Sequence, residues 1–264
     1  IKIIEGGGNS LTGNIVLEYL KNNPNTNILD FSDKGYTDIS YNAFKIFYRI
    51  DNKNSDKSTY TTHDNDTKTK LNNIKEINLS KNKFTIIDVY TFHGLLNLTK
   101  IILSGNAITS IKNGAFDGLN SLTNLDLSDN QISNGALYPS IEINVFKDIE
   151  TLTKLDLNTN ILSKISKGTF LELTNLIELN LSANQIKVIE EDAFNGLSKL
   201  TTLNLSHNNI NKISKDELSK LKFPNLTKLN LTGAFDKSTF TTSNNLTRTI
   251  GVFNNKKITS ELKN

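Results

Sequence analysis

A short apolar motif recurs through most of the sequence and constrains the fold more than any other feature. Each copy has a leucine or isoleucine, two residues, a second leucine or isoleucine, one residue, a leucine, two residues and an asparagine. Most copies begin about 24 residues apart, a period that indicates stacked structural repeats. The asparagines of the six clearest copies are Asn82, Asn106, Asn130, Asn160, Asn184 and Asn208.

A column of aromatic residues keeps the same steps and locates one insertion. Its members are Phe92, Phe116, Phe146, Phe170 and Phe194, with Leu218 in the sixth place. Both columns show one longer step, so about six extra residues must lie between Asn130 and Phe146. We assign the insertion to residues 133–144.

The spacing of the apolar residues predicts a short strand in every repeat. Alternation sends Leu125 and Leu127 to one face of the strand and their neighbours to solvent. Each strand then pairs with the strand of the next repeat, which makes a parallel sheet. The turn after the strand leaves backbone N–H and C=O groups inside, and an asparagine side chain has the donors and the acceptor to satisfy them. We therefore expect an asparagine ladder beside the sheet and a phenylalanine column on the far side of the core.

The motif resembles the leucine-rich repeat family in the form that ends in Ala-Phe-x-Gly-Leu. That ending occurs at residues 115–119 and 193–197. The resemblance implies an α/β repeat fold, a curved right-handed solenoid with a parallel sheet on its concave face. It also implies recognition of a protein ligand, or of a carbohydrate, commonly outside the cell.

The repeats divide the chain into parts. The regular repeats occupy residues 74–235, and a divergent first repeat, in which Lys34 replaces the asparagine, occupies residues 28–47. Residues 48–73 are either a polar loop or a degenerate repeat. Residues 236–264 form a C-terminal cap or tail.

Residues 1–27 are expected to cap the N-terminal end of the stack. The pattern predicts a short amphipathic helix with Ser10 as its N-cap and Ile15, Val16, Tyr19 and Leu20 available for burial. Pro24 then ends the helix.

Composition bears on origin and location. The chain has no cysteine, whereas extracellular animal members of the family normally carry cysteine-clustered caps. This difference favours a bacterial or other microbial protein, secreted or at the cell surface, with a cytoplasmic scaffold as the alternative. Since the chain has no methionine, we expect a processed or trimmed form, in which a removed signal or lipid anchor would leave no trace.

The sequence predicts no catalytic residues, no cofactor and no metal site. Gly6, Gly7 and Gly8 match neither phosphate-binding glycine motif. The histidines, His63 and His93 among them, share no motif with a spaced carboxylate pair. The serines that recur after each strand indicate turn chemistry. The alternative is that the repeats select substrate for a larger effector or enzyme whose catalytic domain lies outside this chain.

Hydropathy and charge argue against two further classes of protein, those that span a membrane and those that bind nucleic acid. No apolar run is long enough for a transmembrane segment. The net charge of +3 is small and scattered, from which we predict no nucleic-acid partner.

Two surfaces are candidates for binding. The first is the exposed face of the sheet, which would present Lys100, Ile102, Asp126, Lys154, Asp156, Glu178, Asn180 and Asn204. Such a polar face could also serve only to keep the sheet soluble, and Asp126 with Asp156 could hold a cation weakly. The second is the insertion, with Leu137, Tyr138 and Ile141, which could bind a ligand or pack back on the solenoid. We expect the insertion to supply most of the affinity and the polar face to set orientation.

Overall fold

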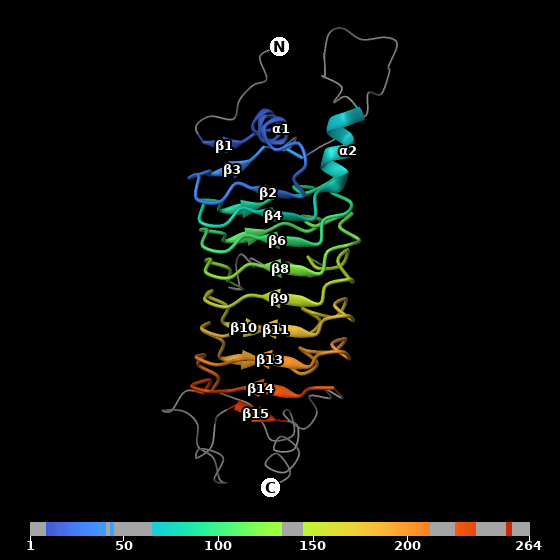
Figure 1. The fold of residues 1–264 in the computed structure, drawn as a ribbon. Helices are drawn as coiled ribbons and strands as arrows, with labels where there is room; N and C mark the ends of the chain where they lie inside the picture. The colour runs from blue at the N-terminus through green and yellow to red at the C-terminus, as the bar shows by residue number, and fades with distance from the viewer. Residues whose placement is uncertain are drawn as a thin grey trace, which may run out of the picture.

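The stack of repeats folds as a solenoid of parallel strands in chain order (Figure 1). The computed structural model describes residues 9–40, 43–44, 65–133, 145–211, 225–235 and 252–254. Within them one nine-stranded sheet runs along the molecule. Its strands are β2 (Ile28–Asp30), β4 (Glu76–Asn78), β6 (Lys100–Ile102), β8 (Asn124–Asp126), β9 (Lys154–Asp156), β11 (Glu178–Asn180), β13 (Thr202–Asn204), β14 (Lys228–Asn230) and β15 (Val252–Asn254).

Neighbouring strands pair in equivalent positions of the repeat. Leu125 aligns with Ile101 on one side and Leu155 on the other, and each is buried. The residues before and after them lie on the open face, as the alternation predicts. All pairings from β2 to β14 are parallel, and β15 closes the sheet by an antiparallel pairing with β14. The parallel-strand solenoid expected from the repeat is therefore confirmed.

The side of the solenoid opposite the sheet carries shorter ladders of two strands each. These are β1 (Ser10–Leu11) with β3 (Asp38–Ile39), β5 (Ile86–Ile87) with β7 (Ser110–Ile111), and β10 (Lys164–Ile165) with β12 (Val188–Ile189). Buried phenylalanine rings stack on one another from repeat to repeat, with centroids 6.0 Å apart for Phe92 and Phe116 and 6.2 Å for Phe170 and Phe194. The phenylalanine column is confirmed, and Phe44 extends it toward the N-terminus. Leu218 lies outside the described residues.

The asparagine ladder joins each repeat to the one before it. The Asn160 amide donates to the carbonyl of Leu157 in its own repeat at 3.1 Å and to that of Leu127 in the preceding repeat at 3.0 Å. Its oxygen accepts from the backbone N–H of Ile132 at 2.9 Å. Bonds of the same kind form at the other five ladder positions, namely Asn82, Asn106, Asn130, Asn184 and Asn208. The ladder expected from the sequence is confirmed.

Two helices lie at the N-terminal end of the stack (Figure 1). Helix α1 (Gly13–Asn22) buries Val16 and Leu20 and ends before Pro24. The prediction that Ser10 is its N-cap is wrong, because Ser10 belongs to β1 and pairs with Asp38, and the residue at the cap is Thr12. Serine before a helix can cap it or can belong to a strand, and the sequence of one short segment does not distinguish the two roles.

The segment before the regular repeats contributes helix α2 (Asn65–Asn73). Strand β2 pairs directly with β4, so no strand from the intervening chain enters the main sheet at that point. Residues 45–64, which include most of the predicted polar loop or degenerate repeat, lie outside the described residues. Among the helices that the structure describes, none has the length and hydropathy required to cross a membrane.

A left-handed residue precedes each ladder asparagine, a feature that the sequence did not reveal. Only two members of this column are glycine. The column consists of Asp33, Lys81, Gly105, Asp129, Thr159, Ala183, His207 and Gly233, with φ from 51° at Ala183 to 70° at Gly105. The left-handed step lets the chain leave the strand and bring the next side chain inward, and it strains every residue that has a Cβ.

Replacing Ala183 by glycine should therefore stabilise the protein. Ala183 has φ of 51° and is exposed, so Ala183→Gly loses no packing and removes steric strain. We expect the free energy of unfolding to rise by about 0.5–1 kcal/mol in urea denaturation. The matched control is Ala107→Gly, at a position whose φ is not positive, which should be neutral or destabilising. A stabilising control, or a destabilising Ala183→Gly, would contradict this account.

Loss of a central ladder asparagine should destabilise the stack more than a change at the divergent end. Asn160→Ala leaves buried carbonyls of two repeats without donors, so we expect a loss of about 1–3 kcal/mol, measured by thermal unfolding. Lys34→Ala, where the first repeat lacks the asparagine, should have a smaller effect because that position has only one complete repeat beside it. Equal losses would mean that the ladder does not carry the stacking.

Candidate functional site

The open face of the sheet carries two rows of side chains, one from each end of the strands. We call the first residues of the strands the leading row and the last residues the trailing row. The leading row contains Ile28, Glu76, Lys100, Asn124, Lys154, Glu178, Thr202 and Lys228. The trailing row contains Asp30, Asn78, Ile102, Asp126, Asp156, Asn180, Asn204 and Asn230. Since the strands pair in equivalent positions, both rows run straight along the solenoid.

Charges of the leading row pair across neighbouring strands. The Lys100 Nζ atom lies 3.1 Å from the Glu76 carboxylate, and the Lys154 Nζ atom lies 3.0 Å from that of Glu178. These side chains are partly exposed, and pairs of this kind add little to stability. Their effect is to present fixed charges of both signs on the open face.

The trailing row starts the turn that follows each strand. The Asp126 Oδ1 atom accepts from the backbone N–H of Ser128 at 3.0 Å and from its hydroxyl at 2.6 Å. Asn180 Oδ1 accepts in the same way from Ser182 at 3.2 and 2.7 Å. This is an Asx turn, and it explains why aspartate or asparagine recurs here and why serine follows two residues later. The prediction that the recurring serines serve the turns is confirmed.

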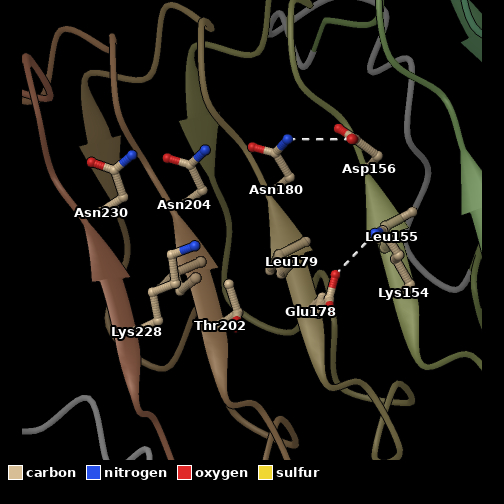
Figure 2. A pocket seen from close by; sticks show the side chains of 11 residues that line it. Lys154, Leu155, Asp156, Glu178, Leu179, Asn180, Thr202, Asn204, Lys228 and Asn230 are labelled. Atoms are coloured by element: carbon tan, nitrogen blue, oxygen red, sulfur yellow. Dashed lines mark hydrogen bonds and ion pairs between the residues drawn. The ribbon is translucent and has the colours of Figure 1, made fainter. Parts of the chain in front are cut away.

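A shallow hollow of about 180 Å³ lies on this face over β9, β11, β13 and β14 (Figure 2). Buried leucines of the strand centres, Leu155, Leu179 and Leu203, form part of its lining. Its polar lining brings together the predicted residues Lys154, Asp156, Glu178, Asn180 and Asn204, and adds Thr202, Lys228 and Asn230. Lys100, Ile102 and Asp126 lie on the same face, on β6 and β8, but outside the hollow.

The two aspartates considered for a cation lie opposite each other on β8 and β9. Asp156 already accepts with both oxygens, from Asn158 at its Oδ1 and from the Asn180 amide at its Oδ2, at 2.6 and 3.2 Å. Asp126 uses its Oδ1 for the turn. Across the described ranges, no group of three or more histidines and carboxylates is placed to hold a metal ion.

The remaining candidates of the sequence are the insertion and the histidines. Leu137, Tyr138 and Ile141 of the insertion, and His63, lie outside the described residues. His93 lies beside Tyr90, with ring centroids 5.8 Å apart. His207 occupies a left-handed position of the turn.

Sequence reasoning missed a threonine column where the chain enters the sheet. The Thr123 hydroxyl donates to the carbonyl of Thr99 at 3.1 Å, and the Thr153 hydroxyl donates to that of Thr123 at 3.1 Å. Thr201 and Thr227 continue the column. The signal was present, since threonine recurs one residue after the first leucine of the motif, and it adds a second side-chain ladder at the other end of the strands.

The family model of the leucine rich repeat matches residues 69–132, 140–186, 150–210 and 174–234, more than half of the chain. The chain is a leucine-rich repeat protein. No curated protein gives a significant match. Among solved structures, it is similar to a chain of the crystal structure of a TLR13–ssRNA13 complex, with 29% identity and a TM-score of 0.47. The match covers 62% of this chain and 26% of that one, so this chain spans only a small part of its relative.

The prediction of no nucleic-acid partner is corrected by this comparison. The similar structure is a complex of TLR13 with ssRNA13. The prediction rested on a net charge of +3, which sums over the whole chain and does not describe the potential over one face. Net charge therefore does not exclude this class of partner.

Four asparagines of the trailing row lie in N-x-[ST] sequences, and we predict that native protein carries no N-glycans there. They are Asn78, Asn180, Asn204 and Asn230. In the folded state the Asn180 oxygen and the Ser182 hydroxyl bond each other, and the amide donates to Asp156, so both sequon side chains are engaged. These sequences are products of the repeat. Mass spectrometry of native material with glycans on Asn180 and Asn204 would contradict the prediction.

Proposed function

We propose that this leucine-rich repeat chain is a non-catalytic recognition module that binds a protein ligand, using the open face of its sheet and the insertion. The observation that carries the proposal is the pair of polar rows held in equivalent positions over the hollow of β9 to β14. Side chains fixed by hydrogen bonds lose little freedom when a ligand binds.

Charge favours a protein ligand over a neutral glycan. The Lys100–Glu76 and Lys154–Glu178 pairs place charges of both signs along the leading row. A partner with fixed charges of both signs gains orientation and association rate from such a pattern. An uncharged sugar would gain neither.

The insertion supplies the apolar contact in this proposal. Leu137, Tyr138 and Ile141 offer surface worth about 25 cal/mol per Å² when buried, whereas the polar rows gain little from desolvation. The location that fits is a microbial surface or the exterior of the cell, consistent with the absence of cysteine.

Deleting residues 136–141 should weaken binding of the partner at least about tenfold, or about 1.4 kcal/mol. The deletion lies outside the repeat period, so the thermal unfolding curve should stay close to that of the unaltered chain. The partner is first recovered with immobilised chain and purified, and dissociation constants are then measured by surface plasmon resonance.

Two further variants separate the surfaces. Asp126→Asn with Asp156→Asn removes two charges and keeps the acceptor that each turn requires, which a change to lysine would not. It should lower the association rate and its salt dependence more than it raises the dissociation rate. Lys187→Glu, away from the two rows, is the control. Normal binding by the deletion with loss of binding by the double variant would assign the site to the sheet face alone, and normal binding by both would refute the proposal.

A further inference from the structure

The asparagines at the C-terminal half of the trailing row have a fixed orientation. The backbone N–H of Ser206 can only donate, and it donates to the side chain of Asn204 at 3.1 Å, so the atom that faces it must be the oxygen. The backbone N–H of Thr232 fixes Asn230 in the same way at 3.1 Å. In Figure 2 the amide nitrogens of these residues point along the row, toward the side of Asp156. The turns thus leave amide N–H groups on the open face.

The two halves of the hollow differ in how far these groups are satisfied. Over β9 and β11, Lys154 pairs with Glu178, and the Asn180 amide donates to Asp156. Over β13 and β14, the amide nitrogens of Asn204 and Asn230 have no partner among the described residues. Lys228 makes no ion pair there either. Within the described residues, the polar groups of the hollow are therefore paired over β9 and β11, whereas donors without a partner remain over β13 and β14.

The amides of Asn204 and Asn230, together with the Lys228 ammonium, favour a ligand group that accepts hydrogen bonds and is negatively charged. Asn204 and Asn230 are paired positions of neighbouring strands, about 4.8 Å apart, so one carboxylate can accept from both amides. Lys228 lies two residues before Asn230 on the same face and adds a positive charge. Charge-assisted hydrogen bonds of this kind are about twice as strong as neutral ones.

We propose that the β13–β14 end of the hollow binds a carboxylate of an acidic peptide segment, through the amides of Asn204 and Asn230 and the ammonium of Lys228. This inference rests on the proposed function, since it names the ligand group of the same face. A peptide fits because it can place one carboxylate at this end of the hollow and lead its other charges away from Glu178 on β11 and Asp156 on β9.

The repeat itself supplies a conservative test variant. Asp30, Asp126 and Asp156 occupy the trailing row in other repeats and accept the same turn hydrogen bonds. Asn204→Asp with Asn230→Asp should therefore keep the turns while replacing two donors by negative charges. The matched control is Asn113→Asp, the same change at an exposed residue just after β7, on the side of the solenoid opposite the sheet.

The probe is a fluorescein-labelled hexaglutamate peptide, followed by fluorescence anisotropy at low ionic strength with unglycosylated protein. We expect the double Asn→Asp variant to bind it at least about tenfold more weakly and Asn113→Asp to change binding less than about twofold. Lys228→Gln, a second and structurally mild variant, should also weaken binding, whereas Lys187→Gln should not. Hexaglutamine should bind more weakly than hexaglutamate.

Other outcomes overturn the inference. Unchanged binding of hexaglutamate by both the double variant and Lys228→Gln, or equal binding of hexaglutamine, would show that this end of the hollow does not select a carboxylate. Tighter binding of a labelled oligouridylate that depends on the same residues would assign the donors to phosphate. If these variants leave peptide binding unchanged while Asp126→Asn with Asp156→Asn still alters association of the purified partner, the proposed function survives without this inference.

Discussion

The fold depends on one side chain that bonds two repeats at once. Each ladder asparagine donates to a carbonyl of its own strand end and to one of the preceding repeat, as Asn160 does with Leu157 and Leu127. Without it, the turn would bury backbone groups with no partner, at a cost comparable to a lost hydrogen bond each. Because the bonds run between neighbours, the ladder holds the turns of successive repeats at the spacing of the paired strands. The sheet, the stacked phenylalanines and the straight rows of the open face all follow from that spacing.

Because the sequence repeats, the residues of the ladder and the core can be predicted from it. Other residues cannot. Asn106 or Phe170 could be placed because each recurs at a fixed step and only one physical role fits that recurrence. The left-handed residues could not, since Ala183 and Thr159 share a backbone conformation but no side-chain chemistry. Ser10 was assigned wrongly because it occurs once, and a single serine before a helix fits both a cap and a strand. The threonine ladder could have been predicted, because threonine recurs at a fixed place in the motif.

The candidate site, too, could be predicted from the sequence only in part. The sequence placed Lys154, Asp156 and Asn180 on one face, since the alternation of the strand decides the face. It could not show which of their atoms are used. Asp156 has both oxygens occupied, whereas the Asn204 amide has no partner among the described residues, and this difference depends on hydrogen bonds within and between repeats. The charges of a face can therefore be counted from a sequence, but the donors and acceptors left for a ligand require coordinates.

Each aspartate or asparagine of the trailing row has one atom that stabilises the turn and another that faces a potential ligand. At every position except Ile102 a side-chain oxygen accepts from the turn, so aspartate and asparagine suit the row equally, and both occur there. They differ only in what faces solvent, a carboxylate oxygen or an amide N–H. An exchange between them changes the charge and the hydrogen-bonding sense of the open face while the turn is preserved. The leading row has no such restriction and holds lysine, glutamate, threonine and isoleucine. A stack built in this way can alter what it binds, one atom per repeat, without altering how it folds.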